Sequence, residues 1–345
     1  MPSITDVAKI AGVSTATVSR TFNTPRLINE QTQRRVLDAA RQLNYEPRRA
    51  RLAAVSGKSF TSSLGYIGFQ FFAATPSDSL LSNTFYASVL AGVQAEAAAF
   101  KLHLLLHTTD RHSLSQEIPK MILQRAVAGI LLVGTTDPAI LATFAQHVQN
   151  IVLIDNRDET NAYESVVSNG FGGAYDAACY LLELGHRRIG FFLGEPSVPT
   201  FQDRLHGYQC ALLNAGIMPD PSLVISGASS EDREANLGSL LCSSQAPTAL
   251  IAANDDYAFV TMRVCRQVFR RIPEDISLIG FDDVPRSREA YPALTTVRVD
   301  KEYMGRLAVR RLHARLCTEN TAQSEPSICN QIPVCLVVRQ SCRAV

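Results

Sequence analysis

The stretch SITDVAKIAGVSTATVSRTFN, residues 3–23, predicts two short helices joined by a tight turn. Ser3 is a candidate N-cap, and Asp6 stands three residues later, where it can complete a capping box. Apolar side chains recur at helical spacing, at Ile4, Val7, Ala8 and Ala11. Gly12 predicts the end of the first helix, because a positive φ is common there, and Ser14 can cap the second.

The second predicted helix has two faces of different chemistry. One side carries Thr17, Val18, Thr21 and Phe22, and the other carries Ala16, Ser19, Arg20 and Asn23, with Thr15 at the exposed first turn. A helix-turn-helix inserts such a polar face into the major groove of DNA. Arginine can hydrogen-bond guanine there, and alanine or threonine methyl groups can contact the thymine methyl. The spacing alone is equally typical of a helical hairpin with a solvated face.

A third helix is predicted after Asn29, which can cap it. Its inner side would carry Val36, Ala39, Ala40 and Leu43. We therefore expect an all-α, three-helix helix-turn-helix domain over residues 1–47, with too few apolar residues for an independent catalytic domain. Residues 48–63 change from an arginine-rich half that can form a helix to a Ser/Gly-rich half, which predicts a linker.

The charge is divided unevenly along the chain. Residues 1–58 contain ten Lys/Arg and four Asp/Glu, a net charge of +6, whereas the remainder contains 23 and 28, a net charge of −5. A basic N-terminal segment on an acidic body is typical of a nucleic-acid reader, because neutralising phosphates supplies much of the affinity. A solvated basic face without a partner shows the same split less often.

Composition excludes several other classes. There is no N-terminal hydrophobic run of the kind found in a secretory leader, and no apolar stretch approaches the roughly 18 residues of a membrane span, so we expect a cytosolic protein. The eight cysteines show no metal-ligand spacing, which predicts reduced, buried thiols and no metal site. No phosphate-binding loop or nucleophile motif is present, so we expect no cofactor and no enzymatic activity.

Beyond residue 64 the pattern alternates continuous apolar runs with amphipathic helices, which indicates parallel sheets covered on both faces. The runs are LGYIGFQFF (64–72), LHLLLH (102–107), GILLVG (129–134), IVLID (151–155), RIGFFLG (188–194), ALIAA (249–253) and SLIGFDD (277–283). This length is too great for one sheet. We therefore expect an α/β core of two doubly wound parallel-sheet lobes.

Polar residues follow several of these runs, at the carboxyl ends of predicted strands where ligands bind in such folds. They are Asp155, Asn254, Asp255 and Asp282, with Arg204 on the helix after RIGFFLG. Taken singly, each is more often a helix cap or a salt-bridge partner. As a set they favour a site for a polyhydroxylated or charged small molecule. The pairs Asp255/Asp256 and Asp282/Asp283 are better explained by capping than by a catalytic or metal dyad, because adjacent side chains point apart.

Motifs along nearly the whole chain resemble, in order, those of the lactose-repressor (LacI/GalR) family of bacterial transcription regulators. They are DVAKIAGVSTATVSRTFN (6–23), LNYEP (43–47), YLLELGHRRIGFFLG (180–194), DRLHGYQCALLNAGI (203–217), ALIAANDDYAF (249–259), IPEDISLIGFDD (272–283) and PALTTVRVD (292–300). The resemblance implies a DNA-binding head, a hinge over residues 48–63 and a periplasmic-binding-protein-like core over 64–345. We place the first lobe at about 64–166 and 297–328, and the second at about 167–296 and 329–345.

The resemblance also implies site residues. Thr15, Ala16 and Arg20 would contact the bases. The DNA phosphates would be contacted by Ser14, Thr17, Asn23, Asn29 and Thr32. The effector site would comprise Phe85, Tyr86, Asp155, Arg204, Asn254 and Asp282. A homodimer on a pseudo-palindromic double-stranded operator is implied, and we expect it to pair along the helix of residues 86–100, through its alanines and Val93.

The hinge departs from the family pattern. The usual asparagine is replaced by Arg48, and Ala54 occupies the place of the leucine that wedges into the minor groove. Leu52 or Val55 could substitute for that leucine, so we include Leu52, Ala54 and Val55 among the DNA-contacting candidates. The chain ends at Val345 without a heptad tail, which favours a dimer over a tetramer.

We therefore hypothesise a bacterial transcription regulator, most simply a repressor released by an inducer. A sugar or sugar derivative is the expected effector, and Arg204 leaves room for an acid or phosphate group. The alternative is a cytosolic small-molecule-binding protein without gene regulation, and a sugar-modifying enzyme is a third reading. The basic head argues against the alternative, and the absence of catalytic motifs argues against the enzyme.

Overall fold

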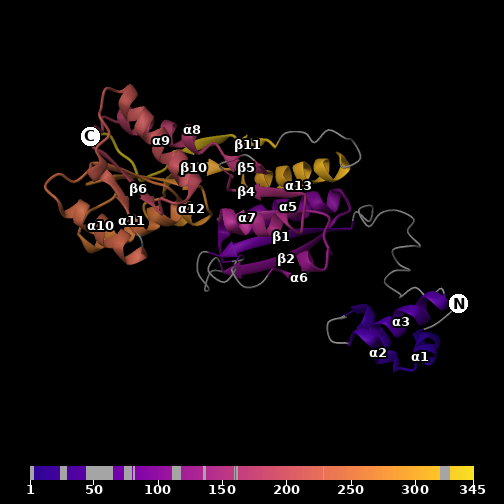
Figure 1. Cartoon of the computed structure of the whole chain (residues 1–345). Coiled ribbons are helices and arrows are strands. Elements are labelled where there is room, and N and C mark those ends of the chain that lie inside the picture. Colours follow the sequence, from indigo (N-terminus) through magenta and orange to yellow (C-terminus); the bar gives the residue numbers. More distant parts are fainter. Residues whose placement is uncertain are drawn as a thin grey trace. The chain divides into compact units, whose positions relative to one another are not determined.

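The computed structural model describes residues 4–23, 29–43, 65–73, 80, 82–110, 118–134, 137–158, 160, 162–227, 229–318 and 327–345 (Figure 1). The chain divides into two compact units, Met1–Leu64 and Gly65–Val345. The hinge candidates Leu52, Ala54 and Val55 lie outside the described residues. Within those that are described, no helix is both long enough and apolar enough to cross a membrane.

The first unit contains the three predicted helices, α1 (Ile4–Ala11), α2 (Thr15–Asn23) and α3 (Glu30–Gln42). Their common core is small and consists of Val7, Ala8, Ala11, Val18, Val36, Ala39 and Ala40. Two of the predicted caps are present: Ser14 Oγ accepts from the Thr17 N–H at 3.1 Å and Asn29 Oδ1 from the Thr32 N–H at 2.8 Å. Ser3, the predicted cap of α1, lies outside the described residues. Arg35 Nη2 donates to the Ala11 carbonyl at 2.6 Å and so ties α3 to the end of α1.

The second unit contains two six-stranded sheets, in agreement with the predicted fold class. The first has the order β11-β5-β4-β3-β1-β2, and all its pairs are parallel. Its strands are β1 (Tyr66–Ala73), β2 (His103–Asp110), β3 (Ile130–Gly134), β4 (Ile151–Ile154), β5 (Glu164–Ser168) and β11 (Cys329–Ile332). Helices α5 (Thr84–Ala99), α6 (Lys120–Leu123), α7 (Pro138–Ala145) and α13 (Lys301–Thr318) belong to this lobe.

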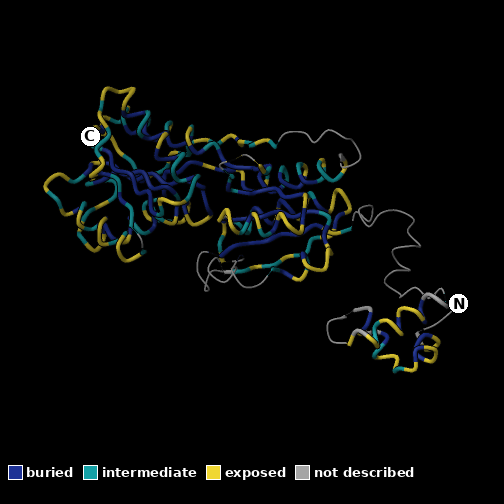
Figure 2. The backbone as a smooth tube through the Cα atoms, viewed as in Figure 1, coloured by how far each residue is buried: buried dark blue, intermediate teal, exposed yellow. Residues whose placement is uncertain are grey.

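The second sheet has the order β12-β10-β9-β8-β6-β7, with one antiparallel pair, β10 and β12. Its strands are β6 (Ile189–Gly194), β7 (Val224–Ser226), β8 (Ala249–Ala252), β9 (Ser277–Asp282), β10 (Thr295–Val299) and β12 (Val334–Val337). Its helices are α8 (Gly170–Glu183), α9 (Pro199–Asn214), the short 3₁₀ helix η3 (Pro221–Leu223), α10 (Ser230–Cys242), α11 (Asp255–Gln267) and α12 (Arg286–Glu289). Figure 2 shows the strands of both lobes buried beneath helices whose outer sides are exposed.

Where the chain passes between the lobes, most of β10 and all of β11 lie in a different lobe from the one predicted. The predicted first lobe began its second segment at residue 297, but β10 pairs with β9 and therefore lies wholly in the second sheet. Residues 329–332 were expected in the second lobe, but β11 pairs with β5 in the first. The chain changes sheets at Pro333, which lacks the N–H that a continuing ladder needs.

Helices α5 and α13 pack with their backbones in contact. A Cβ atom on Gly92 would lie 2.0 Å from the Glu302 carbonyl oxygen, and one on Gly305 would lie 2.1 Å from the Val89 oxygen. Val93 is fully buried in this packing, so its expected place on a dimer face is wrong. The alanines Ala91, Ala95 and Ala98 on the opposite side of α5 are exposed.

Replacing Gly92 with alanine should destabilise the core by about 1–3 kcal/mol, because the new methyl group overlaps backbone that cannot move independently of α13. Gly238→Ala is the matched control, since its Cβ would meet nothing closer than 3.8 Å in helix α10. The control should be neutral or stabilise by about 0.5–1 kcal/mol. Urea unfolding followed by tyrosine fluorescence measures both, and equal effects would contradict the close-packing explanation.

Candidate functional site

The first candidate site is the outer face of α2. Val18 and Thr21 are buried against the other two helices, whereas Thr15, Ala16 and Arg20 are exposed. The outward side of this helix therefore carries two small residues followed, one turn later, by an arginine. Such a face can enter a major groove without steric obstruction and offer a guanidinium to a guanine edge.

The predicted phosphate-contacting residues flank this face. Ser14 and Asn29 are exposed, and Thr17 and Thr32 are partly buried. The Ser14 and Thr17 hydroxyls lie 2.9 Å apart in a side-chain hydrogen bond, and Thr21 Oγ1 donates to the Thr17 carbonyl at 2.9 Å. The position of the Asn23 side chain lies outside what the structure describes.

The second candidate site is a cavity of about 120 Å³ between the lobes of the second unit. All six predicted effector residues line it, and both lobes contribute. The first lobe supplies Phe85 and Tyr86 at the start of α5 and Asp155 after β4; the second supplies Arg204 on α9, Asn254 before α11 and Asp282 at the end of β9. Asp255, a member of the polar set predicted at the strand ends, also lines the cavity. The remaining lining residues were not predicted as effector contacts: Phe201, Val284, Asp256 and residues 82–84.

Arg204 is the central buried charge of this cavity, with only 2% of its surface exposed. It donates through Nη1 to the Ala253 carbonyl, and its guanidinium carbon lies 3.8 Å from the centre of the Phe281 ring. Its Nη2 lies 3.5 Å from Asp282 Oδ1, an ion pair just outside hydrogen-bond geometry. Arg204 Nη2 also donates to the Ser168 hydroxyl at 3.5 Å. Arg204 is therefore held by stacking, one carbonyl and one hydroxyl, with a carboxylate beside it.

Asp155 faces Arg204 from the other lobe. Its Oδ2 accepts a hydrogen bond from the Tyr86 hydroxyl at 3.0 Å. Burial raises the pKa of Asp155, and Arg204 and the Tyr86 hydroxyl oppose this effect. Burial also raises the pKa of Asp282 well above its usual range, again opposed by Arg204. Two carboxylates are thus crowded around one guanidinium in a space with little water.

Three polar atoms at this point have no hydrogen-bond partner among the described residues: Asp155 Oδ1, Asp282 Oδ1 and Arg204 Nε. Buried polar atoms normally find partners, so a cluster of unsatisfied ones beside a cavity indicates a ligand or ordered water. Two acceptors and one donor are available to such a partner.

The other members of the set have structural roles. Asn254 caps α11, since its Oδ1 accepts from the Tyr257 N–H at 2.9 Å. Asp255 was expected to be a cap, which is wrong: it is buried and accepts from the Val284 N–H, the Ser287 hydroxyl and the Thr296 hydroxyl at 2.9, 2.6 and 2.5 Å. Burial raises the pKa of Asp255 to about 6 despite these donors. Asp255 thus holds the loop that follows Asp282.

An ion pair joins the two lobes beside the cavity. Arg157 Nη2, from the loop after β4, lies 2.8 Å from Asp203 Oδ1 on α9. Each residue is close in sequence to a predicted effector residue, Asp155 and Arg204 respectively. This closeness in sequence could have identified the pair. Residues next to Asp155 and Arg204 should face each other across the cavity, and Arg157 and Asp203 carry opposite charges.

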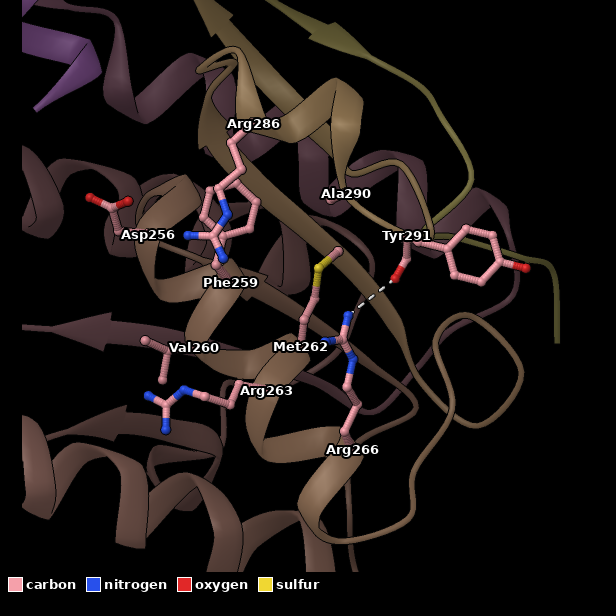
Figure 3. A pocket seen from close by; sticks show the side chains of 9 residues that line it. All are labelled: Asp256, Phe259, Val260, Met262, Arg263, Arg266, Arg286, Ala290 and Tyr291. Atoms are coloured by element: carbon pink, nitrogen blue, oxygen red, sulfur yellow. Dashed lines mark hydrogen bonds between the residues drawn. The ribbon is translucent and has the colours of Figure 1, made fainter. Parts of the chain in front are cut away.

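A larger, more open pocket of about 430 Å³ lies along α11 and α12 (Figure 3). Arg266 Nη2 reaches the Tyr291 carbonyl at 3.5 Å, and the Arg286 guanidinium lies 4.3 Å from the Phe259 ring centre. Its lining comes from one lobe, and none of the unsatisfied buried atoms faces it. The smaller cavity between the lobes is therefore the stronger candidate for a ligand site. Among the described residues no cluster of His, Cys, Asp and Glu could hold a metal ion.

Comparison with known proteins covers both units. Residues 3–48 match the description "Bacterial regulatory proteins, lacI family", and residues 178–342 match "Periplasmic binding protein-like domain". The HTH-type transcriptional repressor PurR of Haemophilus influenzae is 30% identical over 349 residues, which cover 100% of both chains.

Solved structures give the same result. A transcriptional regulator CelR–cellobiose complex is 27% identical, with a TM-score of 0.71, and the match covers 99% of this chain and 100% of the other. The lac repressor dimer bound to operator and the anti-inducer ONPF is 24% identical, with a TM-score of 0.68 and 99% of each chain covered. The second likeness concerns the fold alone.

Reversing the charge of either partner in the Arg157–Asp203 pair should destabilise the core. Exchanging both residues should restore the free energy of unfolding. The expected coupling is about 0.5–1 kcal/mol at low salt, because the pair is only partly exposed, and it should shrink at high salt. A double-mutant cycle of Arg157→Asp and Asp203→Arg in urea unfolding measures this value. A coupling of zero at low salt would mean that the lobes do not meet at this point in solution.

Proposed function

The chain belongs to the LacI family of bacterial regulatory proteins and is a DNA-binding transcriptional regulator, and on that premise we propose that a small molecule bound between its lobes controls its affinity for an operator. The observation that carries this proposal is the group of unsatisfied atoms on Asp155, Asp282 and Arg204 around the inter-lobe cavity. A ligand that satisfies atoms from both lobes binds one lobe arrangement better than another. That difference in affinity is what shifts a conformational equilibrium.

The chemistry of the cavity favours a neutral, hydroxyl-rich ligand such as a small sugar. Among the described residues, Asp155 Oδ1 and Asp282 Oδ1 lack a hydrogen-bond donor and Arg204 Nε lacks an acceptor, although Asp282 Oδ1 lies 3.5 Å from Arg204 Nη2 in an ion pair. A hydroxyl group can serve as either donor or acceptor. Phe85, Tyr86 and Phe201 supply apolar surface for the face of a sugar ring. One structural relative was solved with cellobiose, which supports a carbohydrate.

An anionic ligand is disfavoured, although Arg204 alone would suggest one. Its guanidinium already has Asp282 beside it and donates to the Ala253 carbonyl, so it does not offer a free two-pronged contact. A phosphate or carboxylate would also approach two buried carboxylates. The cavity, at about 120 Å³, is smaller than the pockets of roughly 300–1,000 Å³ that hold drug-sized ligands, which favours a small molecule.

For DNA we propose that α2 reads the major groove and that two copies of the chain bind a pseudo-palindromic operator. The exposed Thr15, Ala16 and Arg20 support the first part. The exposed alanine side of α5 supports a dimer, because small side chains let a second helix approach closely. We propose repression relieved by the ligand, with a coupling of about 1–3 kcal/mol between the two binding events.

Replacing Arg20 with alanine should reduce discrimination between the operator and altered sites by about 1–3 kcal/mol, because a base contact is lost. The operator is first selected from random DNA with the wild-type protein, and affinities are then measured by fluorescence anisotropy. Arg34→Ala, an exposed arginine of α3, is the control and should weaken binding to all sequences alike. Undiminished discrimination by Arg20→Ala would remove α2 as the reader.

A thermal-shift panel tests the ligand proposal. Neutral monosaccharides and disaccharides, uronic acids, sugar phosphates and nucleobases are compared on the full chain, and a neutral sugar should raise the unfolding midpoint in proportion to occupancy. Asp282→Asn should reduce that shift, because the amide keeps only one of the two acceptor oxygens, and should leave operator binding intact. Asp275→Asn, whose partner Arg271 is local, should change neither. A shift with acids or phosphates but not with neutral sugars would overturn the proposed ligand class.

A further inference from the structure

Lys301 is a buried cation at the point where the chain passes from the second lobe back to the first. It is the first residue of α13, two positions after the end of β10, and only 9% of its surface is exposed. Its ammonium group donates to three backbone carbonyls, those of Asp282, Asp283 and Val299, the last two at 3.1 and 3.2 Å. Three hydrogen bonds exhaust the donors of an ammonium group.

Two of those carbonyls belong to a strained segment. Asp282 and Asp283 have φ angles of +114° and +52°, a region that non-glycine residues rarely occupy. Such a conformation persists only where the surroundings hold it. Here Lys301 binds the carbonyls of the segment, and Asp255 accepts the N–H of the next residue, Val284, at 2.9 Å. The Asp283 carboxylate is held as well, because it accepts from Arg298 Nε at 2.7 Å and from Arg339 Nη2 at 2.6 Å. Lys301 is thus the cation that binds the backbone oxygens of the segment, whereas the two arginines bind its Asp283 side chain.

The helix that Lys301 begins is firmly part of the first lobe. Arg310 of α13 pairs with Glu96 of α5 at 2.7 Å, and Arg311 pairs with the buried Glu164 of β5 at 2.6 Å. The ammonium group of Lys301 also lies 5.9 Å from the centre of the Phe85 ring at the start of α5. Lys301 thus links a loop of the second lobe to the helix pair α5/α13 of the first lobe. Phe85 and Tyr86 belong to α5.

We propose that Lys301 is a positioning residue that aims the Asp282 carboxylate into the inter-lobe cavity and couples its position to the α5/α13 pair. It does not reach the ligand itself, because its three donors are occupied by backbone oxygens. Removing the ammonium group leaves the Asp282 carbonyl without its cation, although Arg298 and Arg339 still hold the Asp283 side chain. Asp282 therefore loses its orientation while its chemistry is unchanged. The proposal rests on the proposed function in one respect, that the cavity binds a ligand.

The test uses the full chain with Lys301→Met, which removes the ammonium group and keeps the length of the side chain. Affinity for the sugar identified by the thermal-shift panel should fall by about 10-fold or more, as expected when the support of a binding side chain is lost. In an Asp282→Asn background the same substitution should cause no further loss. Lys301→Arg should recover part of the affinity, and Lys120→Met, an exposed lysine of α6, should change nothing.

A second measurement needs no ligand. Amide hydrogen exchange at Val284 should become at least about 10-fold faster in Lys301→Met, because that N–H is protected only while the loop is held against Asp255. If no compound binds the wild-type protein, the proposed function fails while this readout still tests Lys301. Unchanged exchange together with sugar affinity within about 3-fold of wild type would overturn the positioning role. A loss of affinity that is equally large with and without Asp282 would also overturn it.

Discussion

The inter-lobe cavity depends on a mutual neutralisation of buried charges. Arg204 and Lys301 are cations in the interior, and Asp155, Asp255 and Asp282 are the carboxylates around them. Removing an ion from water costs several kcal/mol, and only close partners and well-placed hydrogen bonds offset that cost. Because Asp155 comes from one lobe and Arg204 from the other, the charges are balanced only when the lobes are together. The same electrostatics that makes the cavity a candidate binding site therefore makes it sensitive to lobe geometry.

Much of this arrangement followed from simple rules applied to the sequence. Continuous apolar runs identified most of the central strands, because strands covered on both faces need no polar residues. The rule that ligands bind beyond the carboxyl ends of parallel strands pointed to Asp155, Asn254 and Asp282, which the fold brings to one cavity. The helical periodicity of the first 43 residues likewise separated the buried Val18 from the exposed Arg20. In each case a short-range pattern carried the information.

What escaped prediction depends on contacts between distant residues. Strand β5 begins with Glu164, which reads as a surface residue until Arg311, far along the chain, pairs with it. The roles of Asp255 and Lys301 arise from hydrogen bonds across 29 and 19 positions, to Val284 and Asp282. Strand β10 belongs to the second lobe and β11 to the first, against the prediction, because strand pairing decides their places and composition does not encode that pairing. Long-range partners decide these features, and a single sequence contains no direct signal for them.

The placement of β11 and β12 has a consequence for biosynthesis. Each sheet receives one strand from residues 329–337, so neither lobe is complete until these residues have left the ribosome. The core of the helical head, in contrast, lies entirely within the first 43 residues and is synthesised first. A message that is cut short would therefore yield a head without either finished lobe. Such a fragment would retain the exposed face of α2 without the inter-lobe cavity, so any coupling between the two requires residues 329–337 to be synthesised.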